Sequence, residues 1–356
     1  MKIVYLAKIS TKDGEGVNKK IAAQISAWRS LGVVVCPVFI AKDDRIPAEL
    51  KRVAPKLIVQ RKITSFYIRD CEVEKTVEEF CPNLVYFRMG SFPFFSVFKV
   101  FSFPVILEVN TKVYNELKVS YSGLKYYILK FLFNVILRKA SGYVGVTMEC
   151  LVGLPERPSF QVGNSIDFDR NFFQDVVRER VPNSACVFVG SSGCSWHGVD
   201  RLLEIARFNP EYTFRIVGYS KEDVEEISGN RVPDNVEVFG FLTGDPYQRL
   251  LRDSTIAFGS LAMDRNGMEY SSSLKNRDYL QFGLPIIMQG RDSDLSTLEC
   301  IFELPMDFDV LDVGKVLRNA AVVDLKAEMS YLIERAIDAR KVESRRVRFF
   351  ESFLIK

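Results

Sequence analysis

Residues 264–278 hold the side chains best suited to chemistry in this sequence. Cations, carboxylates and several hydroxyl groups are gathered there, with charges at Arg265, Glu269, Lys275, Arg277 and Asp278. A nucleotide sugar requires cations for its diphosphate and carboxylates for its hydroxyl groups. The segment is therefore a candidate site for an anionic, hydroxyl-rich ligand. The alternative is a solvated loop before an ordinary charged helix start.

A Gly/Ser-rich loop at residues 190–200, GSSGCSWHGVD, is the second candidate. Backbone N–H groups of such a loop can approach phosphate oxygens, and the helix that follows adds its positive end. The residues assigned to this role are Gly190, Ser191, Ser192 and Gly198. His197 is the only histidine in the chain and stands at the helix entrance, where it serves either chemistry or packing. An ordinary connecting turn is the alternative.

Polar groups in the first half are expected to border the same ligand cleft. Gly14 and Gly16 lie in a loop between an apolar run and a helical pattern. Glu108 and Asn110 end another apolar run, and polar side chains at the carboxyl ends of parallel strands often face ligands. They could equally be turn residues that cap the next helix.

These residues need a scaffold, and regularly spaced apolar runs indicate one. The strands expected in the first half are residues 2–7, 33–40, 84–87, 105–109 and 143–147, with a helix at 17–31 after the first strand. Alternation of strand and helix is typical of a parallel sheet with right-handed crossovers.

The same pattern starts again near residue 183. The strands expected there are residues 186–190, 213–218, 236–240 and 255–260. We therefore predict an α/β protein with two Rossmann-like, doubly wound domains. Their predicted limits are 1–170 and 183–336, joined by a linker between 168 and 183, with a C-terminal helix at 337–356 that packs back on the first domain.

Two further segments have helical character. Residues 125–139 are almost wholly apolar between basic residues and too short to span a bilayer. A core helix is the preferred interpretation, because the basic residues do not share one helical face; a helix at a lipid interface is the alternative. Residues 326–353 are helical in periodicity and strongly charged.

Composition excludes several classes of protein. The chain has 356 residues, of which 47% are hydrophobic and 26% charged, as in a globular protein of two domains. A formal net charge of +3 is too small to indicate nucleic-acid binding. The seven cysteines include no CxxC pair, which favours reduced thiols over disulfides or a metal site. We expect a cytoplasmic protein, with peripheral contact at the inner membrane left open.

Taken together, these segments resemble the GT-B glycosyltransferases, especially the retaining family 4 and its relatives in bacterial capsule and O-antigen assembly. The resemblance is strongest from 190 to 288. The segments that carry it are WHGVD at 196–200, the short helix before GLP at 283–285, YFRMG at 86–90 and LEVNTKVYNE at 107–116.

The resemblance implies roles for three residues near this helix. Asp278 stands where the second carboxylate of a Glu-x7-Glu element holds the ribose. Glu269, one residue out of register, would approach the donor sugar. Lys275 matches a common variant in which a lysine precedes the helix.

The family's Gly-Arg…Lys-Gly diphosphate grip aligns with residues 190–198. Ser191 stands in place of the arginine and His197 in place of the lysine. The resemblance therefore leaves Lys275, Arg265 or Arg277 to supply the positive charge.

The implied activity is transfer of a sugar from a nucleotide-diphosphate donor to a glycan or lipid-linked acceptor in surface-polysaccharide synthesis, with retention of configuration. Catalysis would stabilise the leaving group through Lys275 and His197, with Glu269 at the sugar, and would need neither metal nor bound cofactor. The acceptor side would be formed by Gly14, Gly16, Glu108 and Asn110.

Two alternatives remain open at this point. One is a catalytically silent GT-B protein that acts as a scaffold or partner in a glycan-assembly complex. The other is a nicotinamide-dependent Rossmann enzyme, which the absent three-glycine fingerprint disfavours.

Overall fold

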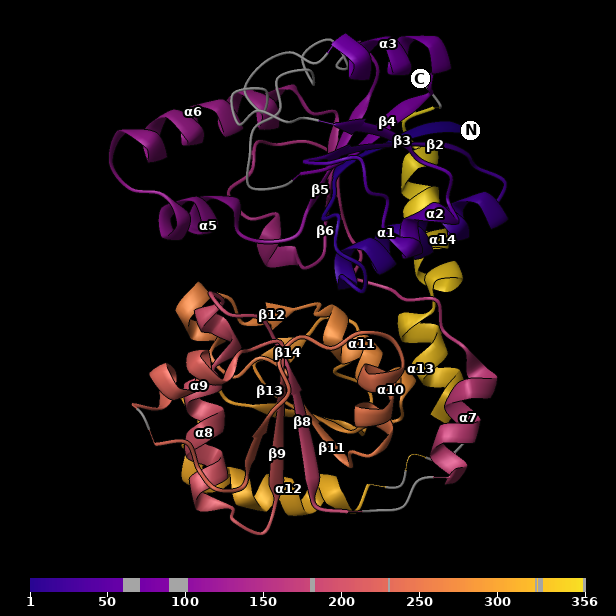
Figure 1. Cartoon of the computed structure of the whole chain (residues 1–356). Coiled ribbons are helices and arrows are strands. Elements are labelled where there is room, and N and C mark those ends of the chain that lie inside the picture. The colour runs from indigo at the N-terminus through magenta and orange to yellow at the C-terminus, as the bar shows by residue number, and fades with distance from the viewer. Residues whose placement is uncertain are drawn as a thin grey trace. The chain divides into compact units, whose positions relative to one another are not determined.

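The computed structural model describes residues 1–59, 71–89, 102–179, 183–229, 231–323, 325 and 329–354. The chain forms two compact units (Figure 1). Unit 1 consists of Met1–Asp167 together with Asp338–Lys356, and unit 2 of Phe168–Ile337. Each unit contains a parallel sheet with helices, so the predicted class of two Rossmann-like α/β domains is confirmed.

The described part of unit 1 contains a seven-stranded sheet in the order β3-β2-β1-β4-β5-β6-β7, with every neighbouring pair parallel. The strands are β1 (Lys2–Lys8), β2 (Val34–Ala41), β3 (Lys56–Val59), β4 (Leu84–Arg88), β5 (Val105–Val109), β6 (Gly142–Gly145) and β7 (Ser159–Gln161). All five predicted strands of this half are present. The strand order reverses between β1 and β4, the point at which doubly wound sheets usually bind ligands.

The helices of unit 1 include one that the chain supplies only after unit 2. The described helices are α1 (Gly16–Ser30), α2 (Ala48–Lys51), α3 (Cys71–Phe80), α5 (Val113–Ser120), α6 (Gly123–Lys139), the 3₁₀ helix η2 (Met148–Cys150) and α14 (Ala339–Glu351). Helix α14 packs against α1 (Figure 1). Its Glu343 is buried and accepts hydrogen bonds from Trp28 Nε1 at 2.8 Å and from Ser165 Oγ at 3.0 Å.

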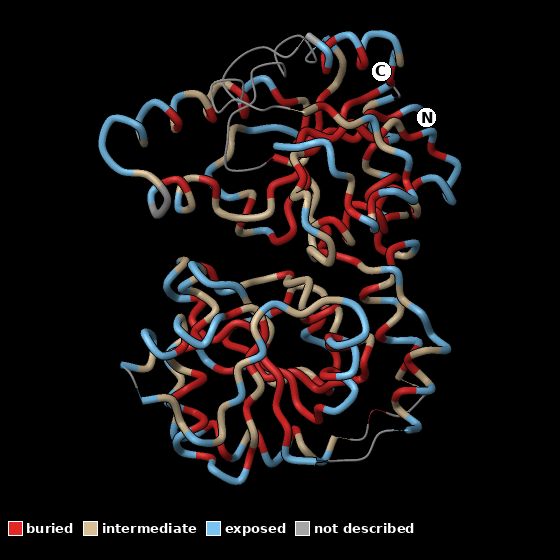
Figure 2. Tube along the Cα trace, in the orientation of Figure 1, coloured by how far each residue is buried: buried red, intermediate tan, exposed pale blue. Residues whose placement is uncertain are grey.

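The core of unit 1 lies where α14 meets the central strands. The rings of Tyr5, Trp28, Tyr86 and Phe350 are mutually packed, with centroids 5.1–5.4 Å apart for the contacting pairs. Strands β1, β4 and β5 are buried almost throughout (Figure 2). Burial on both faces is the usual condition of central strands in a parallel sheet.

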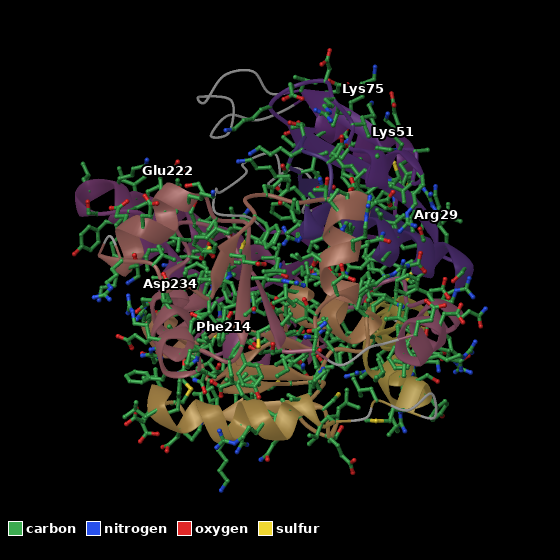
Figure 3. All side chains as sticks on the ribbon, turned by 60° about the horizontal axis from the view of Figure 1, so that its bottom comes forward. Arg29, Lys51, Lys75, Phe214, Glu222 and Asp234 are labelled. Carbon is green, nitrogen blue, oxygen red and sulfur yellow. The ribbon has the colours of Figure 1, made fainter. Side chains whose placement is uncertain are left out.

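The described part of unit 2 contains a six-stranded parallel sheet in the order β10-β9-β8-β11-β13-β15, with β12 and β14 paired beside it. The strands are β8 (Ala185–Val189), β9 (Thr213–Val217), β10 (Val236–Val238), β11 (Ile256–Phe258), β12 (Tyr270–Ser271), β13 (Ile286–Gln289), β14 (Arg291–Asp292) and β15 (Ile301–Leu304). The four predicted strands of this half are present. Phe214 of β9 packs inside this unit against Phe258 at 5.9 Å, whereas Glu222 and Asp234 are exposed (Figure 3).

The helices of unit 2 alternate with the strands of its sheet along the chain. The described ones are α7 (Arg170–Glu179), η3 (Ser195–His197), α8 (Val199–Phe208), α9 (Lys221–Ser228), α10 (Gly244–Arg252), η4 (Met263–Asn266), α11 (Leu274–Gln281), η5 (Val310–Asp312), α12 (Val313–Ala321) and α13 (Ser330–Ile337). No helix in the described ranges is long and apolar enough to cross a bilayer.

Two segments differ from the prediction. Helix α7 occupies most of the predicted linker, because Phe173 and Val176 are buried on one side of it and Arg170 pairs with Glu334 of α13. The stretch 326–353, predicted to be helical, is divided into two helices, α13 and α14. They are separated at Asp338, whose carboxylate accepts the N–H groups at the start of α14.

Candidate functional site

The loop after β8 is built around a close backbone contact. Gly190 donates its N–H to Val217 O at 2.9 Å. Gly218 has φ +90, and a Cβ atom there would lie 2.0 Å from Gly190 O. A Cβ atom at Gly190 would lie 2.8 Å from the rings of Phe188 and Tyr219. Both glycines are therefore required by packing, whatever the loop binds.

Two further N–H groups of this loop are engaged within the protein. Ser191 donates to His197 Nδ1 at 3.2 Å, and Gly198 donates to Ser195 O at 3.2 Å. Gly198 has φ +72, and a Cβ atom there would meet Leu261 at 2.9 Å. Ser191 and Ser192 are exposed. The predicted cradle of amides is thus satisfied internally at Gly190, Ser191 and Gly198, and the loop offers its serine hydroxyls to a ligand.

His197 holds this loop together as a neutral side chain. Its Nδ1 accepts the N–H of Ser191 and lies 3.3 Å from the hydroxyl of Tyr219. Burial, assisted by the charge of Lys275, lowers the pKa of His197 to about 3. The acceptor role of Nδ1 places the proton on Nε2. His197 therefore does not replace the family's lysine as a cation.

Lys275 places a buried cation beside the loop that follows β8. It lies in the first turn of α11, and its Nζ is 4.3 Å from the centroid of the Phe188 ring. This Nζ is buried and has no hydrogen-bond partner among the described residues. Burial lowers the pKa of Lys275 to about 7. A buried ammonium without a partner is costly, and a bound anion would remove that cost.

The helix that presents Lys275 is fixed by its own ends. Tyr279 accepts the N–H of Val189 on its hydroxyl at 2.7 Å, which ties α11 to the end of β8. Gly283 has φ +61 and terminates the helix before the buried strand β13. The short helix expected before GLP at 283–285 is thus present as α11.

The two arginines proposed as alternative cations are already paired. Arg265 forms a bidentate ion pair with Asp200 and donates to Ser195 O at 3.1 Å. Arg277 is fully buried and pairs with Asp292 and Asp294. Arg277 thus anchors α11 to β14, and its charge is balanced by these two carboxylates.

The two carboxylates of the predicted site lie in different surroundings. Glu269 precedes β12, its side chain is 49% exposed, and the nearest Arg291 nitrogen lies 3.9 Å away. Asp278 lies on α11 and accepts a hydrogen bond from the hydroxyl of Tyr247 on α10 at 3.2 Å. Their roles toward sugar and ribose stay predictions.

In unit 1, Glu108 faces inward rather than toward a cleft. It is fully buried and pairs with Lys20 of α1. Burial alone would raise the pKa of Glu108, but the charges of Lys20, Arg346 and Arg88 outweigh it and hold the pKa at about 2. Glu108 is therefore engaged by α1 in this structure, and its role on the acceptor side stays a prediction.

Asn110 lies at the rim of a pocket, as expected for the end of β5. The pocket has a volume of about 230 Å³ and is lined by residues of β4, β5, α5 and α6, including Arg88, Tyr121 and Phe133. Asn110 Oδ1 accepts from Lys20 Nζ at 3.0 Å. Asn110 Nδ2 and Arg88 Nε are buried and have no hydrogen-bond partner among the described residues.

The glycine loop of unit 1 has a structural role in the residues described. Gly14 has φ +81 and donates its N–H to Glu49 Oε1 at 2.6 Å, and Gly16 begins α1. Arg88 and Tyr219 were missed as site residues. The signal for Arg88 was its place at the carboxyl end of β4, which is equivalent to that of Asn110 on β5; Tyr219 follows β9 in the same way.

The two parallel-sheet units of this chain have the GT-B fold of glycosyltransferases. No protein-family model and no curated protein sequence matches the chain. Similarity is found among solved structures, including several that share 15% sequence identity or less with this chain.

Three of these solved structures cover nearly the whole chain. The Anabaena protein HepE in complex with UDP has a TM-score of 0.69 at 15% identity, covering 99% of this chain and 100% of its own. A glycosyltransferase from Rickettsia africae has a TM-score of 0.68 at 10% identity, covering 100% and 99%. The lipopolysaccharide outer core galactosyltransferase WaaB has a TM-score of 0.63 at 15% identity, covering 99% and 100%.

Proposed function

We propose that this protein is a glycosyltransferase that moves a sugar from a nucleotide-diphosphate donor to a glycan or lipid-linked acceptor. The observation that carries the proposal is the buried ammonium of Lys275 beside the loop that follows β8, for which the described residues provide no hydrogen-bond partner. The HepE structure with UDP and glucose supports it, because that protein shares the fold and binds both parts of such a donor.

Lys275 would act on the leaving group. Departure of the sugar leaves negative charge on the diphosphate, and a fixed ammonium in a water-poor site stabilises that charge strongly. Binding of the diphosphate would in turn raise the pKa of Lys275 from about 7 and keep it protonated. The reaction would then require no metal for this neutralisation.

The neighbouring groups would orient the donor. The Nε2–H group of His197 is left as a donor by the engagement of Nδ1, and the hydroxyls of Ser191 and Ser192 are exposed beside it. We assign Asp278 to the ribose and Glu269 to the donor sugar on the resemblance. Retention of configuration and a place in surface-polysaccharide synthesis rest on the resemblance as well.

The acceptor would be bound by unit 1, at the pocket lined by Arg88 and Asn110. Its lining combines Arg88 and Asn110, whose side chains can donate hydrogen bonds to sugar hydroxyl groups, with the rings of Tyr121 and Phe133, on which the carbon face of a sugar can pack.

The test is donor binding by a matched pair of lysine variants. Wild type would be screened against UDP-, GDP- and ADP-sugars by thermal shift, and the binding donor measured by calorimetry. Lys275→Met should weaken that donor by at least tenfold, whereas Lys221→Met, at an exposed lysine of α9, should not change it. Unchanged affinity in Lys275→Met would refute the assignment.

A catalytically silent GT-B scaffold is the second candidate. It is favoured by the loop after β8, whose N–H groups at Gly190, Ser191 and Gly198 are engaged internally. Failure of wild type to bind any sugar nucleotide of the panel would favour this candidate over the transferase.

A further inference from the structure

The outer face of α6 has a pattern that sugar transfer does not explain. The helix is anchored by its inner face, where Leu129, Phe133, Ile136 and Leu137 are buried. Four large apolar side chains on the other side are exposed: Leu124 (76%), Tyr127 (67%), Ile128 (50%) and Phe131 (65%). We call these four residues the α6 stripe.

The α6 stripe is continuous rather than scattered. Its members are spaced by three, one and three residues, which places all of them on one side of a helix. Single exposed apolar residues are ordinary on protein surfaces, but a contiguous apolar row marks a contact surface. The preferred interpretation of residues 125–139 as a core helix is therefore only half right, because one face is buried and the opposite face is exposed.

The charged residues of α6 itself are all basic. At 100° per residue, Lys125 and Lys139 lie along one side of the stripe and Lys130 along the other, whereas Arg138 falls within the arc of the stripe, about two turns beyond Phe131. The 17 residues of α6 include no aspartate or glutamate. A basic border around an apolar centre fits a surface with anionic groups above an apolar layer.

We propose that the α6 stripe docks on an anionic lipid surface. Its apolar side chains would enter the boundary between headgroups and acyl chains, and the four basic side chains would contact lipid phosphates. A protein partner fits less well, because lysine is depleted in protein–protein interfaces whereas three lysines border this stripe.

This surface narrows the class of acceptor, an extension that rests on the proposed function. The pocket of unit 1 is lined by Phe133 of α6 and by Val113 and Leu117 of α5, so the helix that carries the α6 stripe also forms a wall of the pocket. Helices α5 and α6 pack together (Figure 1). An acceptor carried on a lipid would therefore present its headgroup to the pocket while α6 rests on the same lipid surface.

The test is sedimentation of the full-length protein with vesicles of phosphatidylglycerol or of phosphatidylcholine. Wild type should bind the anionic vesicles more tightly, and salt should weaken that binding. Leu124→Ser/Phe131→Ser should reduce binding by roughly tenfold or more, since two large apolar groups leave the lipid. The matched control is Met148→Ser/Val152→Ser, which changes two residues of unit 1 outside α6 that are 64% and 75% exposed.

Three results would overturn the proposal. The first is that wild type does not bind anionic vesicles, and the second is that the stripe variant binds them as tightly as wild type. The third is that wild type does not bind lipid but associates with itself, and that the stripe variant loses this self-association. The last result would show that a second copy covers the stripe. Affinity for the nucleotide-sugar donor in solution, measured for the same proteins, tests the transferase proposal separately. This affinity should be equal in wild type and both variants. If wild type bound no donor, the transferase proposal would fail while the vesicle result would still stand.

Discussion

Replacing Lys275 by methionine should stabilise the unliganded protein while it removes donor binding. Methionine keeps an unbranched apolar side chain over Phe188 and removes the ammonium, which has no hydrogen-bond partner among the described residues. Burial lowers the pKa of Lys275 from 10.5 to about 7. That difference corresponds to roughly 5 kcal/mol of penalty on the protonated folded state, as an upper limit.

The pH dependence of this gain distinguishes the charge from better packing. Between about pH 7 and 10.5 the folded wild type binds fewer protons at Lys275 than the unfolded chain, so its stability from this group rises with pH. The advantage of the variant should therefore be largest at pH 6, near the limit of roughly 5 kcal/mol, and should fall to roughly 2 kcal/mol at pH 9.

Urea unfolding at pH 6 and pH 9, followed through the transition of unit 2, measures this advantage. Lys221→Met is the matched control and should show no comparable dependence on pH. A sugar nucleotide should raise the melting temperature of wild type and not that of Lys275→Met. A variant that is less stable than wild type at pH 6, or that gains equally at both pH values, would refute the reasoning about a buried, unpaired charge.

Three other predictions follow from contacts already described. Gly218→Ala should lower the stability of the protein by about 3 kcal/mol or more and weaken donor binding, because its Cβ would lie 2.0 Å from Gly190 O. The control Gly229→Ala, where φ is +66 and the space is open, should lower the stability by only about 1 kcal/mol, and melting curves compare the two variants. His197→Asn, which keeps a neutral acceptor, should hold donor affinity within a few-fold, whereas His197→Lys should lose tenfold or more by calorimetry; the reverse order would show that a cation belongs there. The Glu108 carboxyl has a pKa of about 2 against 4.5 when free, so its contribution to stability is complete above pH 4.5 and is lost as the pH falls toward 2. Unfolding experiments should therefore show that Glu108→Gln is less stable than wild type by a smaller amount at pH 3 than at pH 6.

Local pattern was sufficient for the parts of the structure that repeat. The strand–helix alternation predicted the two parallel sheets, and the charged segment before Gly283 led to Lys275. Pattern failed where a distant segment decides the outcome. Lys20 neutralises Glu108 from 88 positions away, which no local spacing can indicate.

The failure at α6 has a different physical origin. Its apolar residues surround the whole helix, so periodicity alone cannot tell which of them another element covers. Arg265 illustrates the same difficulty for charges. The sequence shows that an arginine is present, whereas only the folded chain shows that it already forms an ion pair with Asp200.

The return of α14 to unit 1 has a consequence for synthesis of the chain. Unit 2 is a continuous segment inserted into unit 1, which stays incomplete until residues after 338 leave the ribosome. Until then the indole N–H of Trp28 lacks Glu343 and the hydroxyl of Tyr86 lacks Arg346, its donor at 2.6 Å. Unit 2 can therefore finish folding first, and a truncation that removes α14 should leave unit 2 folded while unit 1 becomes a substrate for chaperones and proteases.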